Sequence, residues 1–257
     1  MLCLLALNAC EMRNEGDTLP QSTEGGIEML LVPAGEFLMG SPDGESGREV
    51  SEVLHRVRLT RPFYLGVTEV TQKQWRTVMN ANPSHFTACG DDCPVERVSF
   101  HDIDAFLSKL NASTGASFRL PTEAEWEYAC RAGGRAPFGN RSTLAGTDAN
   151  INGRYPYQAA AASDESKGTL PVGRFKPNAW GFLDMSGNVW EWTRDAYCPY
   201  PQAEVTDPLG RCDASFRVIR GGSWKFDGNS ARCALRYTHR PQDLGFSLGF
   251  RLARDPR

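Results

Sequence analysis

Residues 119–134 read RLPTEAEWEYACRAGG, and this stretch predicts a short helix. Thr122 is followed three residues later by Glu125, so the hydroxyl can cap the first turn while the carboxylate reaches back to the backbone of Thr122. Trp126 and Cys130 then recur at helical spacing and predict the buried face. The stretch therefore places a helix in the middle of the chain, close to a cysteine.

The same capping pattern occurs twice upstream, at Thr71 with Gln74 and at Ser99 with Asp102. Three short helices are therefore expected before residue 135. Ahead of them, residues 29–41 read as strand, Pro-Ala-Gly turn and strand, which predicts a hairpin at the start of the fold.

Residues 55–70 alternate apolar and polar positions and predict further strand structure. From Pro137 onward Gly, Pro, Asn and Asp interrupt short apolar pieces, and the helical period disappears. So long an irregular stretch needs metal ions or disulfides to hold it in place. No linker divides residues 27–257, so one domain is expected there.

Charge and hydropathy exclude two kinds of partner. The 257 residues contain 28 Lys and Arg against 31 Asp and Glu, a net charge of −3, and the basic residues are scattered singly. No phosphate-binding stripe results, so a nucleic acid is not expected as a partner. No apolar run approaches the roughly 20 residues that span a bilayer.

The first ten residues, MLCLLALNAC, resemble a bacterial lipoprotein signal that ends in a lipidated Cys10. They lack the basic segment that usually precedes the apolar run, and an ordinary apolar N-terminus is the alternative. Residues 11–26 are polar and rich in turn-forming residues, as in a tether. We expect an exported protein, in the periplasm or on the outer surface, that touches the membrane only through this lipid.

Cysteine usage also indicates export. The chain has eight cysteines, and six remain if Cys3 and Cys10 belong to the signal. An even number suits disulfides in an oxidising compartment. Order along the chain proposes Cys89 with Cys93 and Cys198 with Cys212, leaving Cys130 for Cys233. Six cysteines allow many other pairings, and buried free thiols in a cytosolic protein are the alternative.

Four motifs occur in order: residues 119–134, GFLDMSGNVWEWTRD at 181–195, RVIRGGSW at 217–224 and LGFRLA at 248–253. Together they resemble the sulfatase-modifying-factor family, whose best-known members are formylglycine-generating enzymes. The similarity runs from about Met29 to Asp255. It implies a single loop-rich α+β domain related to the C-type lectin-like fold, stabilised by calcium and by disulfides, with Cys130 and Cys233 as one bonded pair.

The resemblance also implies two structural calcium sites. Calcium prefers carboxylate and carbonyl oxygens, which turn-rich loops supply. The first set carries over onto Asn150, Ile151, Asp164 and Ser166, and the second onto Ser186, Gly187, Val189 and Glu191, with Asp184 close enough to add charge. The alternative for the first set is that Asn150 and Asp164 are solvated turn residues.

The active-site segment departs from that of the enzymes. Formylglycine-generating enzymes need two cysteines between the GGS and RCA blocks, whose thiolates hold the copper(I) that activates oxygen. In this chain the intervening residues are WKFDGNSA, with Phe226 where the first ligand would stand. Copper is therefore not expected. Ser223 matches a serine beside the active site of the family, although a Gly-Gly-Ser turn also has a purely conformational explanation.

Two functions remain. The first is a calcium-stabilised binding or scaffolding module in the cell envelope, which presents the groove near Ser223, Trp224 and Phe226 to a peptide, protein or glycan. The second is an oxidative or maturation enzyme with different chemistry in the same groove. The four histidines are isolated in sequence and lack metal-ligand spacing.

Overall fold

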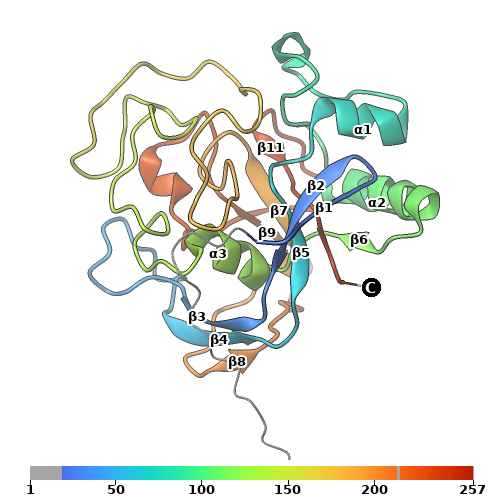
Figure 1. The fold of residues 1–257 in the computed structure, drawn as a ribbon. Coiled ribbons are helices and arrows are strands. Elements are labelled where there is room, and N and C mark those ends of the chain that lie inside the picture. Colours follow the sequence, from blue (N-terminus) through green and yellow to red (C-terminus); the bar gives the residue numbers. More distant parts are fainter. Residues whose placement is uncertain (1–18, 213–214, 257) are drawn as a thin grey trace, which may run out of the picture.

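The computed structural model describes residues 19–212 and 215–256 (Figure 1). The expected signal segment, its Cys10 and most of the tether lie outside these residues. Within them, no helix is long and apolar enough to cross a bilayer. The elements in chain order are β1 (Gln21–Glu24), β2 (Ile27–Val32), β3 (Gly35–Met39), β4 (His55–Leu59), β5 (Phe63–Gly66), α1 (Gln72–Met79), η1 (Thr87–Cys89), α2 (Phe100–Thr114), β6 (Phe118–Arg119), α3 (Glu123–Arg131), β7 (Trp190–Ala196), β8 (Val205–Thr206), β9 (Arg217–Arg220), η2 (Gly228–Ala231), β10 (Tyr237–His239), β11 (Leu248–Gly249) and β12 (Ala253–Arg254).

The strands form three small sheets, with orders β1-β2-β5-β12-β6, β10-β9-β7-β11 and β3-β4-β8. The expected hairpin over residues 29–41 is wrong, because β2 and β3 belong to different sheets. The hairpin that does form is β1–β2, which turns at Gly25 and Gly26 with φ of 59° and 76°, the left-handed region that glycine tolerates. Strand β1 thus extends the ordered domain into the segment that the sequence assigns to a tether.

The three expected helices are confirmed, each with a complete capping box at its N-cap residue, Thr71, Ser99 or Thr122. Helices α1 and α2 pack through Trp75 and Phe106, whose rings stack 5.0 Å apart in the larger core. Helix α3 differs from both, since all nine of its residues are buried. It contacts β3, β7 and β9, so it lies between two sheets at the centre of the fold (Figure 1).

Between α3 and β7 the chain forms no regular helix or strand across residues 132–189. A small core of Phe138, Leu144, Ala149, Ile151, Tyr157 and Ala231 lies under this stretch. The three disulfides pair as chain order proposes: Cys89–Cys93, Cys130–Cys233 and Cys198–Cys212. Cys233 lies two residues after the end of segment 224–231, which the resemblance compares with the copper-binding segment of the enzymes, so the central disulfide ties that region to α3.

Candidate functional site

The turn after β9 is built on two glycines. Gly221 and Gly222 have φ of 95° and 72°, which disfavours a side chain at either position. A Cβ on Gly222 would also lie 2.8 Å from the carbonyl oxygen of Ser230, so the turn and η2 need the glycine to approach this closely. The geometry therefore supports the conformational explanation of the Gly-Gly-Ser motif.

Ser223 does not reach the surface. The residue is fully buried, and its hydroxyl has no hydrogen-bond partner within the described chain. Its carbonyl accepts the N–H of Phe226 at 3.0 Å, which closes a tight turn. A ligand on the surface would meet the residues after Ser223 first.

Those residues begin a continuous aromatic surface, defined by Phe226, Tyr237, Phe246 and the partly exposed Trp224. Phe226 is 36% exposed, Tyr237 51% and Phe246 50%. The buried ring of Trp190 underlies the surface, 5.6 Å from Phe226 and 5.7 Å from Tyr237. The indole N–H of Trp224 donates to the carbonyl of Phe246 at 3.3 Å. The contacts join β10, β7 and two loops into one patch.

The patch continues onto the loop before η1. The ring of Phe86 meets Trp224 edge to face at 5.3 Å, and the exposed His85 lies 5.1 Å from Phe246. Exposed apolar groups that adjoin one another mark an interaction surface more often than scattered ones do. Aromatic rings add contact area at a low entropic cost. The groove expected near Ser223 is thus a surface of rings above a buried serine.

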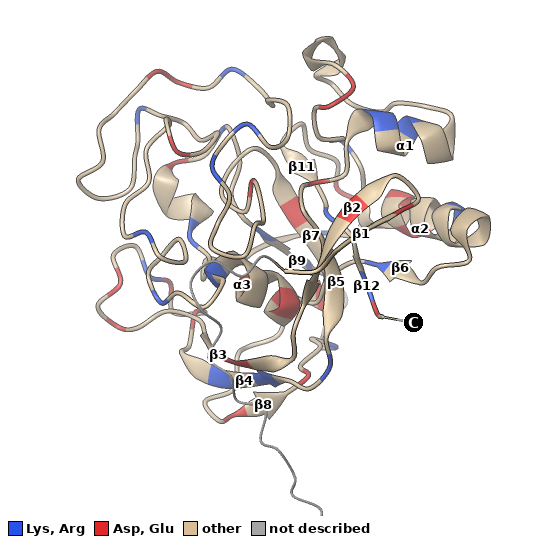
Figure 2. Cartoon of the chain, viewed as in Figure 1, with Lys and Arg blue, Asp and Glu red and all other residues tan. Residues whose placement is uncertain are grey.

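A network of buried arginines ties β9 and the residue before β10 to α3. Arg220, at the end of β9, donates to Glu127 at 2.6 Å and to Glu123 at 2.9 Å, and both carboxylates lie on α3. Arg236 makes a two-point contact with Glu123 at 2.7 and 2.9 Å. Burial alone would raise the pKa of Glu123, but the charges of Arg236 and Arg220 hold it below its ordinary value. Figure 2 shows these charged positions on α3 and β9 inside the fold.

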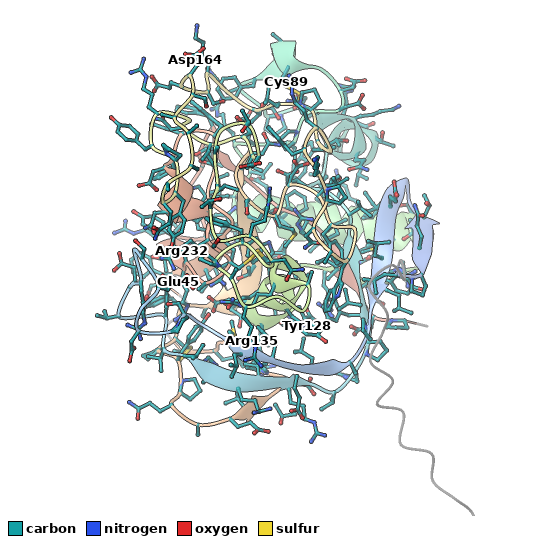
Figure 3. The ribbon with its side chains drawn as sticks, turned by 60° about the vertical axis from the view of Figure 1, so that its left-hand side comes forward. Glu45, Cys89, Tyr128, Arg135, Asp164 and Arg232 are labelled. Carbon is teal, nitrogen blue, oxygen red and sulfur yellow. A yellow bond between two sulfur atoms is a disulfide. The ribbon has the colours of Figure 1, made fainter. Side chains whose placement is uncertain are left out.

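A third buried arginine, Arg232, anchors the loop before β4. Arg232 donates to both oxygens of Glu52 at 2.8 Å and to Glu45 at 2.8 Å (Figure 3). Burial raises the pKa of Glu45, whereas hydrogen bonds from Arg232 and Ser41 outweigh burial and lower the pKa of Glu52. The segment after η2 is therefore fixed at Arg232 as well as at Cys233.

The first expected calcium set is only partly brought together. Asn150 is buried, and its side-chain oxygen accepts the hydroxyl of Ser166 at 2.6 Å. Ile151 packs in the small core. Asp164 is exposed, and its side chain points outward at the edge of the molecule (Figure 3). The amide of Asn150 also donates to Asn188, which links this loop to the second set.

In the second expected set, Glu191 is engaged by the protein itself. Arg251 contacts both of its carboxylate oxygens at 2.7 Å, and the indole of Trp126 donates to one of them at 2.7 Å. Gly187 and Val189 lie in the same turn, where the N–H of Gly187 donates to Gly221 at 2.8 Å. The hydroxyl of Ser186 donates to Ala231 at 3.2 Å. This loop thereby positions the Gly-Gly turn.

Glu69 is a buried carboxylate that sequence patterns do not reveal. It is fully buried, and neither of its oxygens has a hydrogen-bond partner among the described residues. Burial, and then the charges of Asp184 and Glu191, raise its pKa well above the ordinary value. Asp184 accepts the N–H of Gly173 at 2.6 Å, and burial raises its pKa too.

These two carboxylates fit a calcium ion, because its charge would compensate both of them and backbone carbonyls could complete the shell. In the described part of the chain, no three His, Cys, Asp or Glu side chains gather as a metal site. A calcium ion here would therefore depend on carbonyl oxygens in addition to Glu69 and Asp184.

The family can now be established by comparison. Residues 15–256 match the model of the sulfatase-modifying factor enzyme 1-like domain. The chain belongs to the sulfatase-modifying factor family. The formylglycine-generating enzyme of Streptomyces coelicolor is 31% identical, over 92% of this chain and 91% of its own length. The inactive C-alpha-formylglycine-generating enzyme 2 of mouse is 36% identical, over 88% and 85%.

The solved structure of PvdO from Pseudomonas aeruginosa has a TM-score of 0.78 and 28% identity, covering 93% of this chain and 99% of that one. The loop-rich α+β fold is thereby confirmed as that of the sulfatase-modifying factor family. Relatives of the chain include proteins named as formylglycine-generating enzymes and one named as inactive, so membership alone does not assign an activity.

Sequence reasoning missed the buried arginines, although the quoted motifs contain them: Arg220 precedes Gly-Gly, Arg232 precedes Cys233, and Arg251 lies in LGFRLA. Arginine is usually exposed, so a motif alone does not indicate burial. Their partners are far away in sequence, with Glu123 97 residues before Arg220. The sequence signal that could have indicated their burial is an arginine inside an otherwise apolar or glycine-rich motif.

Proposed function

We propose that this protein is a binding module of the sulfatase-modifying factor family that presents its aromatic surface to a peptide. The observation that carries the proposal is the position of that surface: Phe226 begins it where the enzymes carry a copper ligand. All six cysteines of the described chain are bonded in pairs, so none of them is free to supply a thiolate. In this proposal the chain keeps the fold of the family, and the aromatic surface takes the place of the copper site.

A peptide is the favoured ligand because the enzymes that the chain resembles act on a cysteine within a polypeptide. Exposed Tyr237 and Phe246 can pack on apolar or proline-rich side chains without any reaction. Leu244, two residues before Phe246 in the chain, is 56% exposed and offers a further apolar side chain. The three disulfides support location in an oxidising compartment, and we propose the cell envelope.

We further propose that one calcium ion binds beside Glu69 and Asp184 and has a structural role. A buried carboxylate without a partner is unfavourable, and a bound cation would remove that cost. The loop that carries Asp184 also positions the Gly-Gly turn through Gly187. Calcium would therefore stabilise the floor of the aromatic surface.

A randomised peptide library tests the function. The native protein and the double variant Tyr237→Ala/Phe246→Ala are used as parallel targets, since both side chains are about half exposed and can be removed without opening a core. We expect peptides that are enriched on the native protein and lost on the variant. Absence of any peptide that is enriched on the native protein and lost on the variant would contradict the proposal, and so would formation of formylglycine in a sulfatase peptide.

A further inference from the structure

A separate groove of about 440 Å³ lies along the outer edge of β3, away from the aromatic surface. Its far wall is formed by α3, by the loop after α3 and by Trp180. Tyr128 and Arg135 lie together between α3 and the β3–β4 ribbon (Figure 3). Nothing in the proposed function uses this groove.

The near wall is an open strand edge. Strand β3 is the outer member of the sheet β3-β4-β8. The N–H of Ser41 points toward the β4 side, to Glu52, whereas the N–H and the carbonyl of Gly40 point the other way, to Glu127 at 2.9 Å and to Arg131 at 2.6 Å. Directions alternate along a strand, so the backbone groups of Leu38 and Glu36 also face the groove.

Glu36, Leu38 and Gly40, which are two apart along β3, line the groove, and Phe37 between the first two lines it as well. An unpaired edge offers N–H and C=O groups at the spacing of another strand. An added extended segment would pair with these groups and cover Leu38, which is 36% exposed.

The groove also has an aromatic pocket. Tyr128 meets Phe37 at 5.1 Å and Trp180 edge to face at 4.8 Å. Leu54, 39% exposed, adds to the apolar lining. A pocket of this kind accepts an apolar side chain from alternate positions of a docked strand.

The charges that line the groove favour an acidic side chain on the ligand. Arg56, Arg131 and Arg135 line the groove against one carboxylate, Glu36, in a protein whose net charge is −3. Arg56 pairs with Glu36 at 3.2 Å and Arg131 with Glu127 at 2.8 Å. Arg135 is exposed and has no charged partner among the described residues. Its guanidinium can therefore take a carboxylate from a ligand.

We propose that the edge of β3 binds an extended peptide as an added strand, with an apolar side chain against Tyr128 and Trp180 and a carboxylate beside Arg135. Main-chain hydrogen bonds to β3 hold the segment, while the pocket and the arginine select its side chains. The ligand class is an extended acidic peptide.

The test uses the randomised peptide library with the full chain and three variants. Arg135→Glu reverses the charge at an exposed position, and Lys109→Glu, on the exposed face of α2, is the matched control. Tyr237→Ala/Phe246→Ala removes the aromatic surface. We expect peptides with an apolar and an acidic residue that bind the native protein, Lys109→Glu and Tyr237→Ala/Phe246→Ala, and bind Arg135→Glu at least tenfold more weakly.

A selected peptide is then synthesised with N-methyl groups on alternate backbone nitrogens. Methylation of the nitrogens that face β3 should weaken binding at least tenfold, and methylation of the opposite set should not. Loss of all peptides on Tyr237→Ala/Phe246→Ala would assign binding to the aromatic surface and overturn the groove proposal. Absence of any peptide that distinguishes Arg135→Glu from Lys109→Glu would also overturn it, whatever the outcome for the aromatic surface.

Discussion

Arg251 and Glu191 form a two-point ion pair, with both N–O distances at 2.7 Å and both side chains essentially without solvent contact. Arg251 also donates to the carbonyls of Gly66, Val67 and Leu183. The pair therefore joins β7 to the end of β5, to the residue after it and to the long irregular segment before β7. Since Glu191 compensates the buried guanidinium, its first role in the fold is to balance that charge.

Glu191→Gln should lower the free energy of unfolding by about 3–5 kcal/mol, because it leaves Arg251 charged and buried. The measurement is urea unfolding at neutral pH. Glu165→Gln is the matched control, since its pair with Arg154 is 3.4 Å long and half exposed, and removal of such a pair costs about 1 kcal/mol or less. Equal losses in the two variants would contradict this role.

Glu69→Gln should remove most of the stabilisation that calcium provides. At a calcium concentration about 100 times its Kd, a single site adds roughly 2.7 kcal/mol to the native protein. Without calcium the same variant should be no less stable than the native protein, because it removes a buried carboxylate that lacks a partner. Thermal unfolding in calcium and in EDTA measures both effects.

Asp43→Asn serves as the control, because that carboxylate is fully exposed. A calcium-dependent rise in Tm that is as large in Glu69→Gln as in Asp43→Asn would show that the ion does not bind at Glu69. The first expected set, Asn150 with Asp164, would then be the next place to test.

The helices could be predicted from sequence because their signals are local. Thr122 and Glu125 are three residues apart, and the capping box that they form needs no other part of the chain. The pairing of β2 was not predictable in this way. Its neighbour β5 begins at Phe63, and the intervening residues include the two strands of another sheet. Adjacent strands suggested a hairpin that the fold does not use.

The candidate site also combines features that local sequence predicts with features that only the fold shows. The expected departure from the enzymes is local, because it rests on Phe226 and the residues next to it in the sequence. The buried ion pairs that fix the neighbouring segments are not local, since Arg220 with Glu123 and Arg232 with Glu52 join positions 97 and 180 residues apart. Only the folded chain shows that these arginines, and not surface lysines, compensate the carboxylates of α3 and of the loop before β4.

The protein should bind no stoichiometric copper(I). Copper(I) prefers thiolates, and each of the six cysteines in the described chain is already in a disulfide. Elemental analysis after dialysis against a weak copper chelator measures the metal content. Variant Cys130→Ala/Cys233→Ala controls for adventitious binding to that pair. One copper ion per chain in the native protein and in this variant would contradict the expectation.

Asp195 should make the protein less stable as the pH rises. Burial, and then the charge of Glu123, raise its pKa from 3.8 to about 7. The native state therefore binds the proton more tightly than the unfolded chain, so the stabilisation is complete below about pH 4 and is lost as the pH rises through 7. The upper bound of this contribution is on the order of 4 kcal/mol.

Asp195→Asn removes that titration and should flatten the dependence of Tm on pH between 5 and 8. The amide oxygen can keep one backbone hydrogen bond, from Gly210 or from Glu123, which the carboxylate accepts at 2.7 and 2.8 Å. Asp164→Asn is a suitable control, because that aspartate is exposed. An unchanged pH profile in Asp195→Asn would show that the carboxylate stays ionised across this range.

The disulfide Cys130–Cys233 should contribute more to the free energy of unfolding than either of the other two disulfides in the described chain. It closes a loop of 103 residues and joins the end of α3 to the segment that follows η2. Loop-closure entropy gives roughly 4.7 kcal/mol for a loop of about this length and roughly 2 kcal/mol for the four-residue separation of Cys89–Cys93. Cys130, Cys233 and Cys93 are all buried, so each double variant leaves a small cavity, and Cys89→Ala/Cys93→Ala is the control for loss of a disulfide as such. Urea unfolding of the two double variants should show a difference of about 3 kcal/mol or more, and equal losses would mean that the unfolded chain gains little freedom when the central link is removed.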